Sequence, residues 1–240
     1  MLQLFQKIGA WSGLTTARCP ICGTLTNSQE GELCPHCAGK LVPRTGGFCP
    51  TCGDIFGEED SPISQCGDCR TTPPPWSRLY FHSVYSGLLR DLILGYKFNN
   101  GLGRTMLLAD MAYNTFNKTA KSLPDAIIPV PLHRKRLLSR GYNQSTELCR
   151  TLARRLERPV ISDGLNRIKN TIPQTKLGAV ERRENIKAAF RAAPLRVKGK
   201  SILLVDDVYT TGATLRECTR TLIRAGTKEV NVLVLARAMR

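Results

Sequence analysis

Two adjacent carboxylates, Asp206 and Asp207, stand directly before a hydroxyl-rich turn that contains one glycine. The turn runs from Thr210 to Thr214, and Gly212 lets its backbone approach a ligand oxygen without a Cβ in the way. Backbone N–H groups of such a turn converge on an anion, and the threonine hydroxyls can donate further hydrogen bonds. The carboxylates would repel a bare phosphate, so these residues predict a ligand with vicinal hydroxyls or a cation beside its phosphate. A ribose 5-phosphate meets that demand.

The residues around the turn predict the elements that hold it. Ile202 to Val205 form a short apolar run, typical of a strand buried on both faces of a parallel sheet. From Leu215 the apolar residues follow a helical spacing that ends at Gly226. The acidic pair then lies at the carboxyl end of a strand, where open α/β sheets bind ligands. A buried strand with an acidic capping turn is the simpler alternative, and a Walker B strand is disfavoured because the chain has no G-x-x-x-x-G-K-[ST] partner.

A second apolar strand, Asp125 to Leu132, leads into a basic loop from His133 to Arg136. Cations at the carboxyl edge of a sheet suit a pyrophosphate, although a solvated basic turn explains the same residues. Further on, the segment from Arg167 to Phe190 has few apolar residues and predicts a mobile flap that closes on a ligand. Strands expected at 79–85 and 230–236 complete an alternation of strands and helices, which predicts a mostly parallel α/β sheet.

Eight of the ten cysteines form four C-x-x-C pairs. Two such pairs supply four thiolates in tetrahedral geometry, the closed arrangement of a structural zinc site. Sequential pairing is the simplest, an interleaved pairing stays open, and disulfides and iron–sulfur ligation are disfavoured alternatives. His36 is expected to be a bystander rather than a ligand, and Cys149 and Cys218 to be buried fillers. Sequential pairing assigns one zinc ion to Cys19, Cys22, Cys34 and Cys37 and a second to Cys49, Cys52, Cys66 and Cys69.

Length and charge set further limits. The chain has 240 residues, with 35 Lys and Arg against 19 Asp and Glu and a formal net charge of +16, which favours anionic partners. It has no apolar run long enough for a membrane span, and residues 1–14 lack the features of a signal peptide, so we expect a cytoplasmic location. The proline-rich hinge at 71–76 predicts a cysteine-rich head over residues 1–75 and a second domain over 76–240.

The stretch ILLVDDVYTTGAT resembles the phosphoribosyl pyrophosphate (PRPP) motif of type I phosphoribosyltransferases. It occurs in order after the C-x-x-C pairs, a Pro-Pro-Pro-Trp hinge, Val130-Pro-Leu, Arg140-Gly-Tyr-Asn-Gln144 and Arg167-x-x-x-Thr-x-x-Gln174. That arrangement resembles the ComF/GntX family, phosphoribosyltransferase-like proteins linked to natural competence and DNA utilisation. The resemblance implies a small double zinc-ribbon head followed by a type I phosphoribosyltransferase-like α/β domain.

The resemblance also implies roles for particular residues. Asp206 and Asp207 would be the catalytic pair, binding the ribose hydroxyls or Mg²⁺. The 5-phosphate would be held by Val208, Tyr209, Thr210, Thr211, Gly212, Ala213 and Thr214. The remainder of the PRPP site would be lined by Arg140, Asn143, Gln144, Arg167 and Gln174.

Two functions remain open at this level. As an enzyme, the protein would transfer a ribose 5-phosphate group from PRPP with Mg²⁺, but no acceptor pocket is recognisable. As a binding protein, it would handle incoming single-stranded DNA during transformation, with basic residues from Arg134 to Arg158 along the phosphate backbone. Expected partners are PRPP or ribose 5-phosphate, single-stranded DNA and proteins of the competence machinery, without a membrane span. We favour a PRPP-binding fold that serves DNA uptake.

Overall fold

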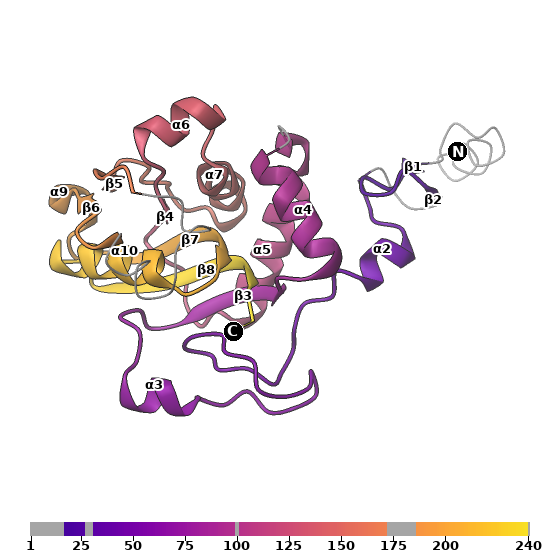
Figure 1. The fold of residues 1–240 in the computed structure, drawn as a ribbon, viewed down its shortest axis with the longest axis horizontal. Coiled ribbons are helices and arrows are strands. Elements are labelled where there is room, and N and C mark those ends of the chain that lie inside the picture. Colours follow the sequence, from indigo (N-terminus) through magenta and orange to yellow (C-terminus); the bar gives the residue numbers. More distant parts are fainter. Residues whose placement is uncertain (1–16, 27–30, 99–100, 172–185, 240) are drawn as a thin grey trace, which may run out of the picture. The chain divides into compact units, whose positions relative to one another are not determined.

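The computed structural model describes residues 17–26, 31–98, 101–171 and 186–239 (Figure 1). Contacts between residues divide the chain into two compact units, 1–42 and 43–240. The first unit contains an antiparallel pair, β1 (Ala17–Arg18) and β2 (Leu25–Thr26), and a short helix, α2 (Pro35–Gly39). None of the helices in these described ranges is long and apolar enough to cross a membrane.

The second unit is built on a four-stranded sheet in the order β3-β8-β7-β4. All three neighbouring pairs are parallel, with Tyr80 opposite Leu233 and Ile127 opposite Leu203. This confirms the predicted mostly parallel sheet. The strands are β3 (Leu79–Val84), β4 (Ala126–Pro129), β7 (Ser201–Tyr209) and β8 (Glu229–Arg237).

Helices cover the two faces of this sheet because the side chains of buried parallel strands alternate between them. On one face, Leu204 and Val232 share a core with Leu222 of α10 (Ala213–Arg224), which lies across β7 and β8 in Figure 1. On the other face the Tyr80 ring packs against Phe116 with centroids 4.9 Å apart. Among the described residues, the helices between β3 and β7 include α4 (Gly87–Phe98), η1 (Gly101–Arg104), α5 (Thr105–Thr119), α6 (Arg134–Arg140), α7 (Gln144–Leu156) and α9 (Pro194–Val197).

Two short strands, β5 (Leu165–Arg167) and β6 (Phe190–Ala192), form an antiparallel pair at the base of the expected flap. Residues 172–185, which make up most of that flap, lie outside the described residues.

The second half of the cysteine-rich region belongs to the same unit as the sheet. The Phe48 ring meets Phe81 of β3 edge-on at 4.9 Å, and the Trp76 indole donates a hydrogen bond to the Thr51 carbonyl over 2.6 Å. A short helix, α3 (Gly67–Thr71), follows in this region. The domain limit at residue 75 stays a prediction from composition.

Candidate functional site: a carboxyl-edge anion site and two cysteine clusters

The stretch with the acidic pair folds as a strand, a turn and a helix, as predicted. The strand β7 is longer than the expected 202–205, so Val208 and Tyr209 lie in its last residues, before the turn. Gly212 has a φ of +75°, and a Cβ at this position would lie 2.2 Å from Cε2 of Tyr209. Only glycine fits there, because the backbone is left-handed and the Tyr209 ring fills the space of a side chain.

Asp207 is buried, and both of its carboxylate oxygens are engaged by neighbouring side chains. Nζ of Lys97, near the end of α4, lies 2.8 Å from Oδ1, and the Gln144 amide donates to Oδ2 over 2.9 Å. Burial by itself would lower the pKa of Lys97, but the charge of Asp207 and the hydrogen bond to it raise that pKa above its ordinary value. The contact is therefore an ion pair at neutral pH.

Asp206 is more exposed than its neighbour, and the pKa of its carboxyl group is raised. It is half-buried, and its Oδ1 accepts hydrogen bonds from the Ser145 hydroxyl and the Asp207 backbone N–H, each over 3.0 Å. Burial, with the added charge of Asp207, raises the pKa of Asp206 to about 7, against the opposing charge of Lys97. The two carboxylates are thus chemically distinct: one is locked in an ion pair, and the other changes charge near neutral pH.

The segment Arg140-Gly-Tyr-Asn-Gln144 brings its predicted residues to this acidic pair. Asn143 caps α7 by accepting from the Ser145 N–H over 3.1 Å, and its amide donates to the Val130 carbonyl over 3.0 Å. The Arg140 guanidinium donates to Oε1 of Gln144 over 2.8 Å, so Gln144 links Arg140 to Asp207. These contacts fix α7 against the carboxyl ends of β4 and β7.

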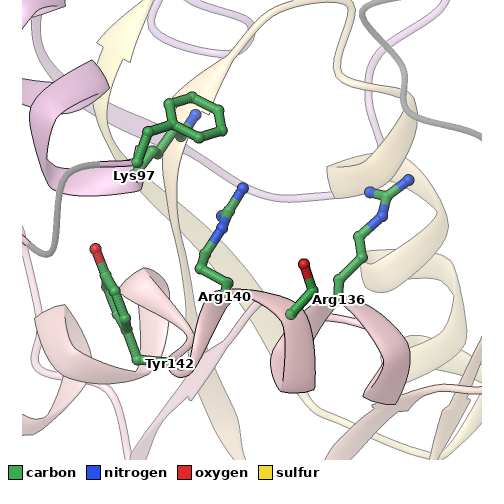
Figure 2. Close-up of a pocket in the computed structure, with 6 residues that line it drawn as sticks. Lys97, Arg136, Arg140 and Tyr142 are labelled. Carbon is green, nitrogen blue, oxygen red and sulfur yellow. The ribbon is translucent and has the colours of Figure 1, made fainter.

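A pocket of about 300 Å³ lies beside Asp207, lined by Lys97, Phe98, Arg136, Ser139, Arg140 and Tyr142. Figure 2 shows Arg136 and Arg140 rising from the same side of α6, with Arg140 the nearer of the two to Lys97. Burial lowers the pKa of Arg136, and the positive charge of Arg140 lowers it further. Cations that repel one another around a pocket without an acidic lining residue favour an anion there.

The sequence placed a loop at His133 to Arg136, and the structure corrects this. The His133 side chain accepts from the Lys135 N–H and caps the helix α6, so the basic residues lie on a helix. The helix begins after Pro129 and Pro131, where no further proline interrupts it.

The two remaining predicted site residues lie differently. Arg167 ends β5, stacks over the Phe190 ring at 5.5 Å and donates to the Thr171 hydroxyl. The Thr171 carbonyl accepts from Arg136 over 2.7 Å, so Arg167 and Arg136 share one partner residue. Gln174 lies outside the described residues.

Sequence reasoning missed Lys97 and Ser145 as site residues. Lys97 lies at the end of a helix predicted from its apolar residues. A basic residue is common at such a position because it interacts favourably with the helix dipole, whether or not a ligand binds. Only the position of Lys97 in the chain could have indicated its role, since the helix after β3 ends near the sheet edge at which β4 and β7 end. Ser145 lies in the first turn of α7, one residue after the segment Arg140-Gly-Tyr-Asn-Gln144.

The cysteines form two clusters in the sequential pairing, and the interleaved pairing is wrong. In each set of four, the ligand atoms lie within 4.8 Å of one another: Cys19, Cys22, Cys34 and Cys37 in the first unit, and Cys49, Cys52, Cys66 and Cys69 in the second. We call these the first and the second cysteine cluster.

Both clusters combine the same two local structures. The first pair of each folds as a tight turn, in which the glycine after the second cysteine has a φ of +73° at Gly23 and +68° at Gly53. The second pair of each lies at the start of a short helix, α2 or α3. Sulfur–sulfur distances of 3.7 Å between Cys22 and Cys34 and 3.6 Å between Cys52 and Cys66 match the edge of about 3.8 Å that Zn–S bonds of about 2.3 Å give a tetrahedron.

The protonation chemistry of the thiols also fits a bound dication. Backbone N–H groups of Cys22 and Cys34 lower the pKa of Cys19 to about 6, whereas burial and neighbouring thiols raise that of Cys37 to about 12. Burial likewise raises the pKa of Cys52 to about 12. Four thiolates at this spacing need a cation between them, so the residues fit two zinc ions.

Comparisons with known proteins agree with this geometry. Residues 13–70 match the family described as "Double zinc ribbon domain", and residues 139–240 match "Phosphoribosyl transferase domain". The chain is 35% identical to Competence protein F of Haemophilus influenzae, over 85% of this chain and 96% of that protein. It is also 35% identical to DNA utilization protein YhgH of Escherichia coli, over 92% of this chain and 90% of that protein. Competence protein ComFC of Bacillus subtilis is 28% identical over 82% and 80%, respectively.

Proposed function

Because the chain belongs to the competence protein F/YhgH family, with a double zinc ribbon and a phosphoribosyltransferase-like domain, we propose that it binds PRPP in the service of DNA uptake and utilisation. One observation carries the PRPP part of this proposal. The ion pair between Lys97 and Asp207 joins the acidic end of β7 directly to a basic pocket. The carboxylates at the end of β7 therefore lie next to the basic side chains of the pocket. PRPP needs such an arrangement, because its hydroxyls lie between two groups of phosphates.

The proposed ligand lies along the carboxyl edge of the sheet. Its 5-phosphate enters the turn 210–214 at the start of α10, where backbone N–H groups favour an anion. Its ribose hydroxyls donate to the carboxylates of Asp206 and Asp207. Its pyrophosphate occupies the pocket of Lys97, Arg136 and Arg140.

Mg²⁺ would accompany the pyrophosphate, as a hard cation that prefers oxygen ligands. Asp206 fits such an ion best among the residues of the site, because it is half-buried whereas Asp207 is held by Lys97 and Gln144. A bound cation would also stabilise the charged form of Asp206, whose pKa is raised to about 7.

Calorimetry with PRPP, ribose 5-phosphate and pyrophosphate, each with and without Mg²⁺, tests this proposal. We expect PRPP with Mg²⁺ to bind most tightly, and Lys97→Met to weaken PRPP and pyrophosphate more than ribose 5-phosphate. Absence of binding by all three ligands at millimolar concentration would refute the sugar-phosphate site.

Active phosphoribosyl transfer is the alternative to a binding role. The cations of the pocket would stabilise the pyrophosphate as it leaves the ribose C1 carbon. A screen of acceptors for pyrophosphate release from PRPP separates the two. Turnover with any acceptor that is lost in Asp206→Asn supports an enzyme, and its absence across the screen supports binding alone.

We also propose that single-stranded DNA is a partner, in a cytoplasm whose reducing conditions keep the cysteine clusters intact. The supporting observation is a set of exposed cations on α6 and α7: Arg134, Lys135, Arg154 and Arg150, the last of which pairs with Glu147. Their contacts with phosphates would release counterions, so affinity should fall steeply as salt rises.

A double substitution separates the DNA surface from the PRPP pocket. Arg134→Ala with Lys135→Ala should reduce the salt dependence of DNA affinity and leave PRPP affinity unchanged, because neither residue lines the pocket. Arg136→Ala, one residue further along the same helix, is the matched control and should reduce PRPP affinity. DNA affinity that ignores both salt and the double substitution would rule out this surface.

A further inference from the structure

We infer that the second cysteine cluster is part of the ligand site, because Arg237 ties it to the turn proposed to bind phosphate. Arg237 is the last residue of β8 and lies opposite Tyr209, the last residue of β7. Its side chain is buried, with 2% of the residue exposed. The inference rests on the proposed function, since it concerns the same turn.

The guanidinium of Arg237 holds two parts of the chain that lie far apart in sequence. Nη1 donates to the Thr210 carbonyl over 2.9 Å and lies 3.4 Å from the Tyr209 carbonyl. Nε donates to the carbonyl of Cys52, a cluster ligand, over 3.2 Å, and Asp54 lies 3.9 Å from Nη2. One rigid, planar group thus bridges the turn and the cluster, which a flexible lysine could not reproduce.

These bonds decide which way the amides of the turn point. In a trans peptide the carbonyl of one residue and the N–H of the next point in opposite directions, and no described peptide bond is cis. The Thr210 carbonyl points to Arg237, and the Tyr209 carbonyl, which also accepts from the Ala238 N–H over 2.9 Å, lies on the same side. The N–H groups of Thr210 and Thr211 are therefore turned away from the guanidinium. Successive N–H groups turned to one side form an anion-binding concavity.

The cluster is shaped to reach Arg237. Gly53 follows Cys52 with a φ of +68°, and a Cβ there would lie 2.8 Å from Cδ2 of Leu79 and 3.4 Å from Cδ of Arg237. Glycine therefore lets this turn lie against the sheet. At Gly23, the equivalent position of the first cluster, a Cβ would meet no atom within 4 Å among the residues described.

A buried guanidinium is costly unless its hydrogen bonds are satisfied. Loss of metal from the second cluster would release the Cys52 carbonyl and the adjoining Asp54. Arg237 would then lose its fixed orientation, and the turn would lose the bond to the Thr210 carbonyl that orients the next amide. The first cluster has the same ligand set but lies in the other unit, and none of the contacts named above involves one of its four cysteines.

Matched substitutions in the full-length protein test the link. Cys66→Ser and Cys22→Ser each remove the most exposed ligand of one cluster. Metal analysis, calorimetry with PRPP and Mg²⁺, and hydrogen exchange at the Thr210 and Thr211 amides are compared with wild type. Each variant should lose about one zinc ion. Only Cys66→Ser should speed exchange at these amides and weaken PRPP binding, by about tenfold, as for the loss of one hydrogen bond to a charged group.

Arg237→Lys provides a second test that keeps the charge and the zinc. It should retain the wild-type zinc content yet speed exchange of the two amides and weaken PRPP binding. Unchanged exchange in Arg237→Lys, or equal effects of Cys66→Ser and Cys22→Ser, would overturn the inference. If wild type binds no PRPP, the proposed function fails, whereas the exchange rates still decide whether Arg237 couples the cluster to the turn.

Discussion

The two cysteine clusters share their ligand types, their C-x-x-C pairs and their local turns, yet they stabilise different amounts of structure. Around the first cluster the described chain contains only a two-residue strand pair and one short helix. Around the second, Phe48 and Trp76 connect the ribbon to the core of the sheet. In the described part of the first unit, the cysteine cluster is thus the main element that stabilises the fold. In the second unit, the cluster is joined to a sheet that has its own apolar core. What surrounds a metal site, and not its ligand set, decides what depends on the metal.

The largest difference should follow metal removal. A chelator should unfold residues 17–42, because this region has little apolar core besides its cysteines, while the sheet of the second unit stays folded. Limited proteolysis followed by mass spectrometry should show cleavage there before any cleavage in β7 or β8. The starting protein should contain about two zinc ions per chain. Simultaneous loss of both regions would show that the second unit also depends on metal.

A smaller effect is expected from breaking the ion pair of the second unit. Asp207→Asn leaves the half-buried Lys97 without its counter-ion. Since loss of one partner of a fully buried pair costs at least about 3 kcal/mol of unfolding free energy, this partly exposed pair should cost about 1–3 kcal/mol. Denaturant unfolding followed by tryptophan fluorescence measures this cost. Zinc content should not change, because neither residue touches a cluster. A variant as stable as wild type would mean that the pair contributes nothing net.

The two equivalent glycines allow a direct test of the comparison. Gly23→Ala should cost about 1 kcal/mol, for the left-handed backbone alone. Gly53→Ala should cost about 1–2 kcal/mol more, because the new Cβ meets the Leu79 side chain. Thermal unfolding of each variant, with zinc content as control, gives the difference. Equal costs would show that the second turn can move away from the sheet.

The smallest effect concerns Asp206 and should stabilise the protein. Its folded pKa of about 7 lies above the ordinary value of 3.8, so between these pH values the folded state holds a proton that the unfolded chain releases. Stability from this group therefore falls as pH rises towards 7. Asp206→Asn removes the charged form and should raise Tm at pH 8 by roughly 2–4 °C, for a gain of about 1 kcal/mol. At pH 4, calorimetric scans of the variant and wild type should coincide.

Local patterns predicted the elements because each depends on neighbouring residues. The apolar run from Ile202 and the glycine at 212 sufficed for the strand and the turn, and C-x-x-C spacing sufficed for the clusters. The strand continues to Tyr209 because the adjacent β8 offers it partners as far as Arg237. That extension of β7 depends on its pairing with β8, so the residues of β7 alone do not predict it.

The contacts that the sequence could not predict join distant segments. Gln144 and Asp207 are 63 residues apart, and Arg237 and Cys52 are 185 residues apart. Lys97 reads as an ordinary helix end until the topology brings it to the edge where β7 ends. A single sequence shows which residues can do chemistry, but their meeting depends on the strand order.

The strand order β3-β8-β7-β4 also determines when each strand can pair while the chain is being synthesised. Among the described strands, β3 pairs only with β8, and β8 is the last of the four to leave the ribosome. Until then β3 has an open edge on a nascent chain, and such edges invite aggregation. Pairings this distant close slowly, since a long loop must be ordered first. The first unit needs only residues near its own cysteines and zinc, so it can be complete before the sheet begins to form.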